Sequence, residues 1–399
     1  MRPDILSFAE GKVAVSLILA AITAASSLPY AGNVIVLWKN PISRLLLLLQ
    51  IPVGLSVVFS LNPSLCLDRY GYYIRMIIVL LLIPVLIQTE QHMKQLLLVM
   101  AFSLGMISAK FGLSGVIHGG VELAGGYGEM LADNNFVALA FAMLLPLAWY
   151  ARQLVKATWA KCALFGIALL CIPAIVMSNS RGSILALTAG LICIVLFTKR
   201  KVLSLILLVA VAGGAIHLVQ DMFTERMSTL AHPTDEASAN SRIVLAGVAL
   251  QIFQEHPFLG IGFGGLNFAV AEQRITGDVR QHVAHNTYLQ VLVDSGIFAL
   301  FLYVALLGYT IFGLERSAHL WGPIAPERAA IARSIQIPLI VFAVGAVFYS
   351  CERMDWPFML ILSGAAWLSI SRRTSEELQT NFGSEVALDA GTTVARIEG

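Results

Sequence analysis

Apolar runs alternate with short polar connections along almost the whole chain. Most runs are roughly 16–20 residues long, enough for a helix to cross a hydrocarbon core about 30 Å thick. Backbone groups in lipid need internal hydrogen bonds, so the runs predict transmembrane helices. The predicted spans are 12–30, 43–60, 71–88, 94–113, 134–151, 160–177, 183–198, 201–219, 287–312, 331–350 and 356–371. Residues 31–38 are short; they either complete a twelfth span with their neighbours or form a half-helix.

The composition excludes an ordinary soluble domain. The chain has 399 residues, of which 58% are hydrophobic and 13% are charged, whereas soluble domains average about 45–50% apolar and about 25% charged residues. The five cysteines are scattered without a C-x-x-C pair, so they are interpreted as small core residues. The fold class is therefore all-α, a polytopic membrane protein of about 11–12 transmembrane helices.

Basic residues give the predicted orientation. They cluster in alternate connections: Arg152, Lys156 and Lys161; Lys199, Arg200 and Lys201; Arg316, Arg328 and Arg333; and Arg372 with Arg373. The side that carries them is predicted to be cytoplasmic. We thus expect one transmembrane domain over 1–371, with a periplasmic loop over 220–286 and a disordered cytoplasmic tail over 372–399.

The 220–286 loop is much longer than the other connections, and loops of this length are usually functional or disordered. Residues 240–257, "NSRIVLAGVALQIFQEHP", predict an amphipathic helix within it. Asn240 or Ser241 can cap its start, apolar residues recur at 243, 246, 250 and 253, and Pro257 ends it. Such a helix lies on the membrane surface or dips into it.

Two short motifs resemble known sites by chance spacing. "GIGFGG" at 260–265 satisfies G-x-G-x-x-G, but a dinucleotide site needs a strand before it. A glycine-rich turn between membrane elements is the better interpretation. "GLSG" at 112–115 with His285 suggests an intramembrane serine protease, but the span count is far too high for that fold. The sequence contains neither D-x-D nor H-E-x-x-H, and no metal site is predicted.

Three polar residues stand at the predicted outer ends of helices: Arg181 in "SNSRGS", Arg242 in "NSR" and His285 in "AHN". Arginines at an interface often only anchor helix ends. However, an arginine at a helix N-terminus opposes the helix dipole, and Ser or Asn stands beside both arginines. Guanidinium binds phosphate bidentately, and helix N-termini also favour phosphate. The sequence therefore predicts a bound diphosphate.

A polyprenyl-diphosphate glycan is a substrate that fits a phosphate site beside a histidine at the outer leaflet. Displacement at its anomeric carbon needs charge stabilisation on the departing diphosphate, which Arg181 and Arg242 can supply. The acceptor hydroxyl needs a base, which His285 can supply. His282 lies three residues earlier in polar loop, where we expect it to be solvated. The reaction requires no cofactor.

Secondary candidates lie on the same side. Asp133, Asn134 and Asn135 open a span and either bind sugar or diphosphate or cap the helix. Lys110 either snorkels or contacts phosphate. Asn286 and Tyr288 flank His285, and Tyr288 is alternatively an interface aromatic.

Four more charged residues are candidates for structural pairing. Asp294, below His285 within its span, needs a partner because a carboxylate at that depth is costly; structural pairing and a proton role stay open. Glu352, Arg353 and Asp355 form a charged corner, in which mutual ion pairing is expected.

The sequence also resembles a known family. "MSNSRGSILAL", "NSR…LGIGFGGLNF" and "AHNTYLQVLVDSGIFALFLYVALL" are similar to the shared core of the O-antigen ligase and polymerase superfamily. "GMISAKFGLSGVIHGG…GYGEMLADNNFVALAFAMLLPL" resembles the O-glycosylation ligases of exosortase-associated loci. The resemblance covers roughly residues 105–312, and it implies that Arg181 and Arg242 bind diphosphate and that His285 acts as the base.

The resemblance implies a metal-independent glycosyltransferase in the bacterial inner membrane, with its site facing the periplasm. The expected donor is an undecaprenyl-diphosphate-linked glycan, and the acceptor is a hydroxyl of lipid A core, another glycan or a protein. No nucleic acid is expected as a partner. A ligase is favoured. A polymerase that uses a second carrier-linked glycan is the alternative, and a transporter of lipid-linked glycan is the competing class.

Overall fold

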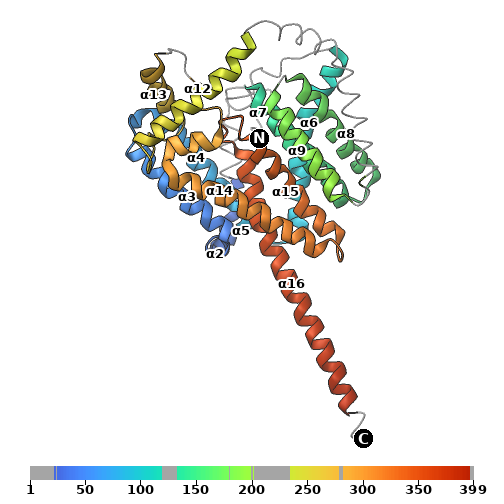
Figure 1. Cartoon of the computed structure of the whole chain (residues 1–399). Helices are drawn as coiled ribbons and strands as arrows, with labels where there is room; N and C mark the ends of the chain where they lie inside the picture. The colour runs from blue at the N-terminus through green and yellow to red at the C-terminus, as the bar shows by residue number, and fades with distance from the viewer. Residues whose placement is uncertain are drawn as a thin grey trace.

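The computed structural model describes residues 22–23, 25–118, 133–178, 180–198, 201, 234–277 and 282–395. All the regular elements in these ranges are helices, seen in Figure 1. They are η2 (Leu28–Val34), α2 (Ile35–Lys39), α3 (Pro41–Val58), α4 (Pro63–Leu80), α5 (Leu82–Leu86), α6 (Glu90–His118), α7 (Asn134–Ala151), η3 (Arg152–Leu154), α8 (Thr158–Met177), α9 (Arg181–Phe197), α12 (Thr234–Glu255), α13 (Leu266–Thr276), α14 (Thr287–Trp321), α15 (Pro326–Gly345) and α16 (Asp355–Ala395).

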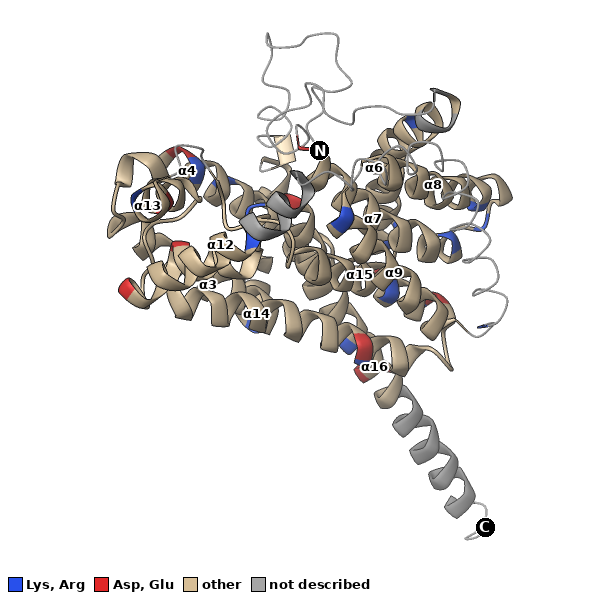
Figure 2. Ribbon diagram, turned by 45° about the horizontal axis from the view of Figure 1, so that its top comes forward, with Lys and Arg blue, Asp and Glu red and all other residues tan. Residues whose placement is uncertain are grey.

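The multi-pass all-α class is confirmed. Within the described ranges, 7 segments are long and apolar enough to cross a membrane, and α9 is a shorter apolar helix. Figure 2 shows that most of the helical length carries no charge. The predicted spans at 12–30, for the most part, and at 201–219 lie outside the described residues, so the total of 11 or 12 stays a prediction. Residues 31–38 fall in η2 and in α2, a short helix that ends at Lys39 with Asn40 as its C-cap.

Helices α7 and α15 form the centre of the bundle. In their most apolar segments, 78% and 72% of residues are buried, more than in the other long helices. They pack against each other, with α9 against both and α6 and α8 against α7, while α14 packs between α15 and α3. Small residues allow this approach: a Cβ on Gly345 would lie 2.3 Å from Leu139 Cδ1, and one on Gly190 2.7 Å from Val341 Cγ2.

A break in α14 receives the glycine loop, which we define as residues 257–265. At the break, Gly296 has φ 79° and ψ −179°, a backbone conformation essentially restricted to glycine. The backbone groups of α14 that the break frees bond to the glycine loop: Ile297 N donates to Pro257 O at 2.9 Å, and Val293 O accepts from Ile261 N at 2.9 Å. The interpretation of "GIGFGG" as a glycine-rich turn is confirmed.

The segment 220–286 contains two helices in its described part, α12 and α13, where the sequence predicted one. Helix α12 begins at Thr234, so the predicted cap at Asn240 or Ser241 is wrong, because these residues continue the helix that precedes them. One side of α12 packs on α13 and α14 through Leu245, Val248, Ala249 and Ile252. On the other side, Ile243 and Leu250, two of the four predicted apolar positions, are exposed, and contact of this side with the membrane stays a prediction.

Helix α16 continues to Ala395, well past residue 371, where the sequence places the end of the last span and the start of a disordered tail. The prediction followed the apolar run, which ends near residue 371, whereas the helix continues through the polar residues that come after it. An example is the i,i+4 ion pair of Arg372 Nε with Glu376 Oε1 at 2.8 Å. In Figure 1 this end of α16 runs out of the bundle, away from α12 and α13.

Candidate functional site

The starts of α7, α9 and α14 meet at the corner loop, which we define as residues 346–354. Ser183 Oγ, in the first turn of α9, donates to Asn135 O at the start of α7 at 3.3 Å. Thr287 Oγ1, the first residue of α14, donates to Tyr349 O in the corner loop at 2.6 Å. The start of α7 also contacts this loop, because the ring centroids of Phe136 and Tyr349 lie 6.5 Å apart. The starts of α7, α9 and α14, with their predicted candidates, are thus brought to one end of the bundle.

The "SNSRGS" corner is built on Tyr349. Ser180 caps α9 and its hydroxyl is hydrogen-bonded to Tyr349 Oη, which also lies 3.0 Å from Ser183 Oγ. A Cβ on Gly182 would lie 2.5 Å from Tyr349 Oη, so only glycine allows this packing. Ser180 and Ser183 are buried, whereas Arg181 between them is the first helical residue of α9 and is exposed. The corner thus places an exposed arginine between two buried serines at the start of α9.

His285 is held in an unusual backbone conformation. Its φ is 47°, and it is the one non-glycine residue of the described chain with positive φ. Asn286 then caps α14, accepting from Tyr288 N at 2.9 Å and from Leu289 N at 3.1 Å. A strained non-glycine residue persists only where its surroundings enforce it, and such residues cluster at functional sites.

The environment of His285 favours its neutral form. Burial lowers the pKa of the imidazole, the charges of Arg242 and His282 lower it further, and Asp133 acts in the opposite direction. A neutral imidazole near pH 7 can accept a proton. The same interactions show that Arg242, on α12, and Asp133, before α7, lie within electrostatic range of His285.

Arg242 is exposed and also acts on the corner loop. Burial raises the pKa of Tyr349, and the Arg242 charge opposes that shift. The sequence placed Arg242 at the start of its helix; this is wrong, because α12 begins at Thr234 and Arg242 lies in its third turn. The helix-dipole reason for an anion there is lost, while the proximity of Arg242 to His285 remains.

His282 is not simply solvated, contrary to the sequence prediction. Its Nδ1 lies 2.7 Å from Glu272 Oε1 on α13, and the Glu272 carboxylate is buried. The pairing arises because α13, which the sequence did not predict, packs beside this loop. His282 therefore has a structural partner.

Several secondary candidates have structural roles. Asp133 caps α7, accepting from Asn135 N at 2.7 Å. Asn286 caps α14, as described above, and Tyr288 Oη donates to Ala343 O at 2.8 Å. Asn134 differs, because its Oδ1 is buried without a hydrogen-bond partner among the described residues. An unpaired buried acceptor is costly, so it is suited to a hydroxyl donor from a ligand.

The remaining charged candidates are Lys110 on α6 and the residues around the corner loop. Lys110 is exposed on α6, and its proposed phosphate contact stays a prediction. The expected ion pairing in the corner loop is confirmed between Arg353 Nε and Glu352 Oε1 at 3.2 Å. Asp355 accepts from Trp356 N as α16 begins. In the described ranges, no three His, Cys, Asp or Glu side chains are grouped to hold a metal ion.

Tyr349, Ser350 and Gln290 were missed from the sequence. Each acts through contacts with residues distant in the chain, such as Ser350 Oγ donating to Gln290 Oε1 at 3.1 Å. The polar run "YSCERMD" between two apolar runs was a signal for Tyr349 and Ser350, but it does not contain Gln290.

The helices and the polar corner define a multi-pass α-helical membrane protein, with Arg181 at the start of α9, His285 just before α14 and Arg242 on α12. Residues 166–304 match the family model described as O-antigen ligase, and residues 1–154 match a model described as a family of unknown function. The match over residues 166–304 supports the assignment of this domain to the O-antigen ligase and polymerase superfamily, as its motifs indicated, and that family implies an enzyme of the glycosyltransferase type. A search of curated proteins finds no match.

Proposed function

We propose that this protein is a metal-independent glycosyltransferase of the O-antigen ligase type. It transfers a glycan from an undecaprenyl-diphosphate carrier to an acceptor hydroxyl at the periplasmic face of the inner membrane. The observation that carries the proposal is the environment of His285. Its imidazole is biased toward the neutral form beside Arg242, at the corner that also presents Arg181.

In the proposed reaction, the acceptor oxygen attacks the anomeric carbon and the bond from that carbon to the diphosphate breaks. His285 takes the hydroxyl proton as the new glycosidic bond forms. Arg181 and Arg242 offset the negative charge that grows on the departing diphosphate. Arg181 and Arg242 are both exposed residues, which is compatible with contact to a carrier headgroup. Asn134 Oδ1, buried and unpartnered in the described structure, is suited to accept from a sugar hydroxyl.

The exposed apolar stripe of α12 supports a carrier in the membrane beside this site. Ile243 is 72% and Leu250 49% exposed, although the opposite side of the same helix is packed. A polyprenyl chain in the outer leaflet presents a surface of matching polarity. Because Arg242 lies on this helix, a carrier that contacts the stripe brings its diphosphate to the arginine.

The test uses purified protein, a defined lipid-linked glycan and a defined acceptor. Release of polyprenyl diphosphate together with a glycosylated acceptor supports transfer, whereas an intact carrier moved across a vesicle membrane indicates a transporter. Chain extension on a second carrier-linked glycan, without acceptor, indicates a polymerase.

The base assignment is tested by His285→Ala, which should lower turnover about 10²–10⁴-fold with carrier affinity nearly unchanged. His282→Gln is the matched control, because a glutamine can still donate to Glu272 and avoids leaving that buried carboxylate unpaired. The control should keep near-normal turnover. Normal turnover in His285→Ala would reject the assignment, and loss of carrier binding alone would make His285 a phosphate ligand instead.

A further inference from the structure

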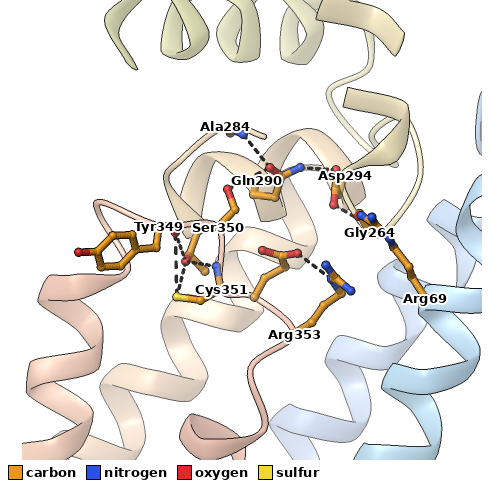
Figure 3. Close-up of polar contacts among 11 residues, drawn as sticks. Arg69, Gly264, Ala284, Gln290, Asp294, Tyr349, Ser350, Cys351 and Arg353 are labelled. Carbon is orange, nitrogen blue, oxygen red and sulfur yellow. Dashed lines mark hydrogen bonds and ion pairs between the residues drawn. The ribbon is translucent and has the colours of Figure 1, made fainter. Parts of the chain in front are cut away.

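Asp294 is a fully buried carboxyl group in α14, next to the break at Gly296. Both of its oxygens accept hydrogen bonds: Oδ2 from Gly264 N at 2.9 Å and Oδ1 from Gln290 Nε2 at 2.8 Å (Figure 3). A carboxyl group at this depth is costly unless it is paired. Through these two bonds, Asp294 links the glycine loop to Gln290, which lies one turn earlier on the same face of α14.

Asp294 also sets the orientation of the Gln290 amide. Because Asp294 Oδ1 accepts from the amide nitrogen, the Gln290 carbonyl must face the opposite way. There Gln290 Oε1 accepts from Ala284 N at 2.9 Å and from Ser350 Oγ at 3.1 Å. Figure 3 shows the resulting chain, which runs from Gly264 through Asp294 and Gln290 to Ala284.

Ala284 is the residue directly before His285, so this amide holds the backbone where it enters the left-handed turn. On the other side of His285, Thr287 N donates to Ala346 O at 2.7 Å. The backbone of His285, with φ 47°, is thus clamped by one bond on each side. Without these bonds, a non-glycine residue would relax to a commoner conformation and its imidazole would move.

We propose that Gln290 and Asp294 are positioning residues: Asp294 orients the Gln290 amide, and Gln290 holds the turn that presents the His285 imidazole to the acceptor. This inference rests on the proposed function, in which His285 is the base. The glycine loop and Ser350 take part in the same positioning, because Gly264 N donates to Asp294 and Ser350 Oγ donates to Gln290.

The network makes a specific prediction about exchanging the two side-chain types. In Gln290→Glu, two carboxyl groups face each other. In Asp294→Asn, the side chain has one acceptor oxygen in place of two, so it cannot accept from both Gly264 N and Gln290 Nε2 in the present arrangement. In the double variant, the amide at position 294 donates to the carboxylate at 290 and accepts from Gly264 N. The other carboxylate oxygen still accepts from Ala284 N and Ser350 Oγ, so every bond is restored.

We expect each single variant to lower kcat about 10- to 100-fold, the scale of a small misplacement of reacting groups, with the KM for the lipid-linked glycan unchanged. The double variant should recover most of that loss. Single variants within about twofold of the parent, or a double variant as impaired as the two losses multiplied together, would overturn the proposal.

A second cycle separates positioning from simple stabilisation of the fold. Gln290→Leu should lower kcat in the parent but cause no further loss in a His285→Ala background, because residues that act as one unit are non-additive. A further loss of similar size in that background would show that Gln290 acts independently of His285. Ser350→Ala removes one hydrogen-bond donor to Gln290 Oε1 and leaves no buried charge unpaired, so it remains a usable test even if the other variants fold poorly. We expect this variant to lower kcat several-fold; unchanged kcat opposes the proposal.

Failure of this inference is distinguishable from failure of the proposed function. If His285→Ala alone keeps full turnover, the base assignment fails, whatever the Gln290 variants do. If His285→Ala is impaired but the exchange at 290 and 294 shows no recovery, only the positioning role fails.

Discussion

Replacing Gly296 by alanine should detach the glycine loop from α14. At φ 79° and ψ −179°, a residue with a Cβ costs about 1–3 kcal/mol. The added Cβ would also lie 2.0 Å from Phe258 O and 2.3 Å from Phe258 C, both backbone atoms that cannot rotate away. Overpacking of this kind costs about another 1–3 kcal/mol, so the total is about 2–6 kcal/mol.

The substitution should weaken the hydrogen bonds between α14 and the glycine loop at the break. Ile297 N to Pro257 O at 2.9 Å and Gly264 N to Asp294 Oδ2 at 2.9 Å both depend on the docked loop. We therefore expect a melting temperature in detergent several degrees below that of the parent, together with reduced transfer. Turnover should be measured at a temperature where both proteins remain folded.

Gly308→Ala is the matched control in the same helix. Its position is ordinary helix, and a Cβ there would meet nothing within 4 Å. Alanine is favoured over glycine inside a helix by about 0.5–1 kcal/mol, so this variant should melt at or above the parent. Equal melting temperatures for Gly296→Ala and the parent would refute the reasoning about the break.

Three further predictions follow from the site. Arg181→Lys and Arg242→Lys should each lower activity about ten- to a hundredfold, because charge-assisted contacts are worth about 1.5–3 kcal/mol and lysine lacks the fork; full activity at normal expression favours simple anchoring. Since the pKa of His285 is below its usual value, kcat should stay level near neutrality and fall only in acid. Arg242→Gln removes a positive charge and should move that acid limb to higher pH, while Arg242→Lys leaves it in place; identical limbs contradict the assignment. In a cysteine-free background, Asp235→Cys should react with an impermeant reagent in spheroplasts and Arg200→Cys should not, and the reverse pattern contradicts a periplasmic site.

The helices themselves were predictable from the sequence. Apolar run length decides a span because lipid leaves no other partner for the backbone, and α7 and α8 start within two residues of the predicted bounds. The helix starts at Ser180 and Asn286 carry equally local signals, because the side chain of a cap residue accepts from a backbone N–H two or three residues further along the chain. The candidates Arg181 and His285 follow from these local signals.

The start of α12 was not predictable from its cap residues. Asn240 and Ser241 are good caps by type, yet the helix runs through them from Thr234. Intrinsic preference is weak, and the packing of Leu245 and Val248 against α13 and α14 holds the helix in place. The position of Arg242 within its helix was misjudged for the same reason.

By itself, the sequence determined the membrane class, most span positions and the family motifs, because each depends on residues close together in the chain. The tertiary structure alone decided how the site is built. Ser180 meets Tyr349 across 169 positions, and Gly264 meets Asp294 across 30. Such pairs form only when packed helices bring them together, since no local spacing encodes which distant donor meets which acceptor. The left-handed turn at His285 depends on these contacts, because its backbone is held by partners from α14 and the corner loop.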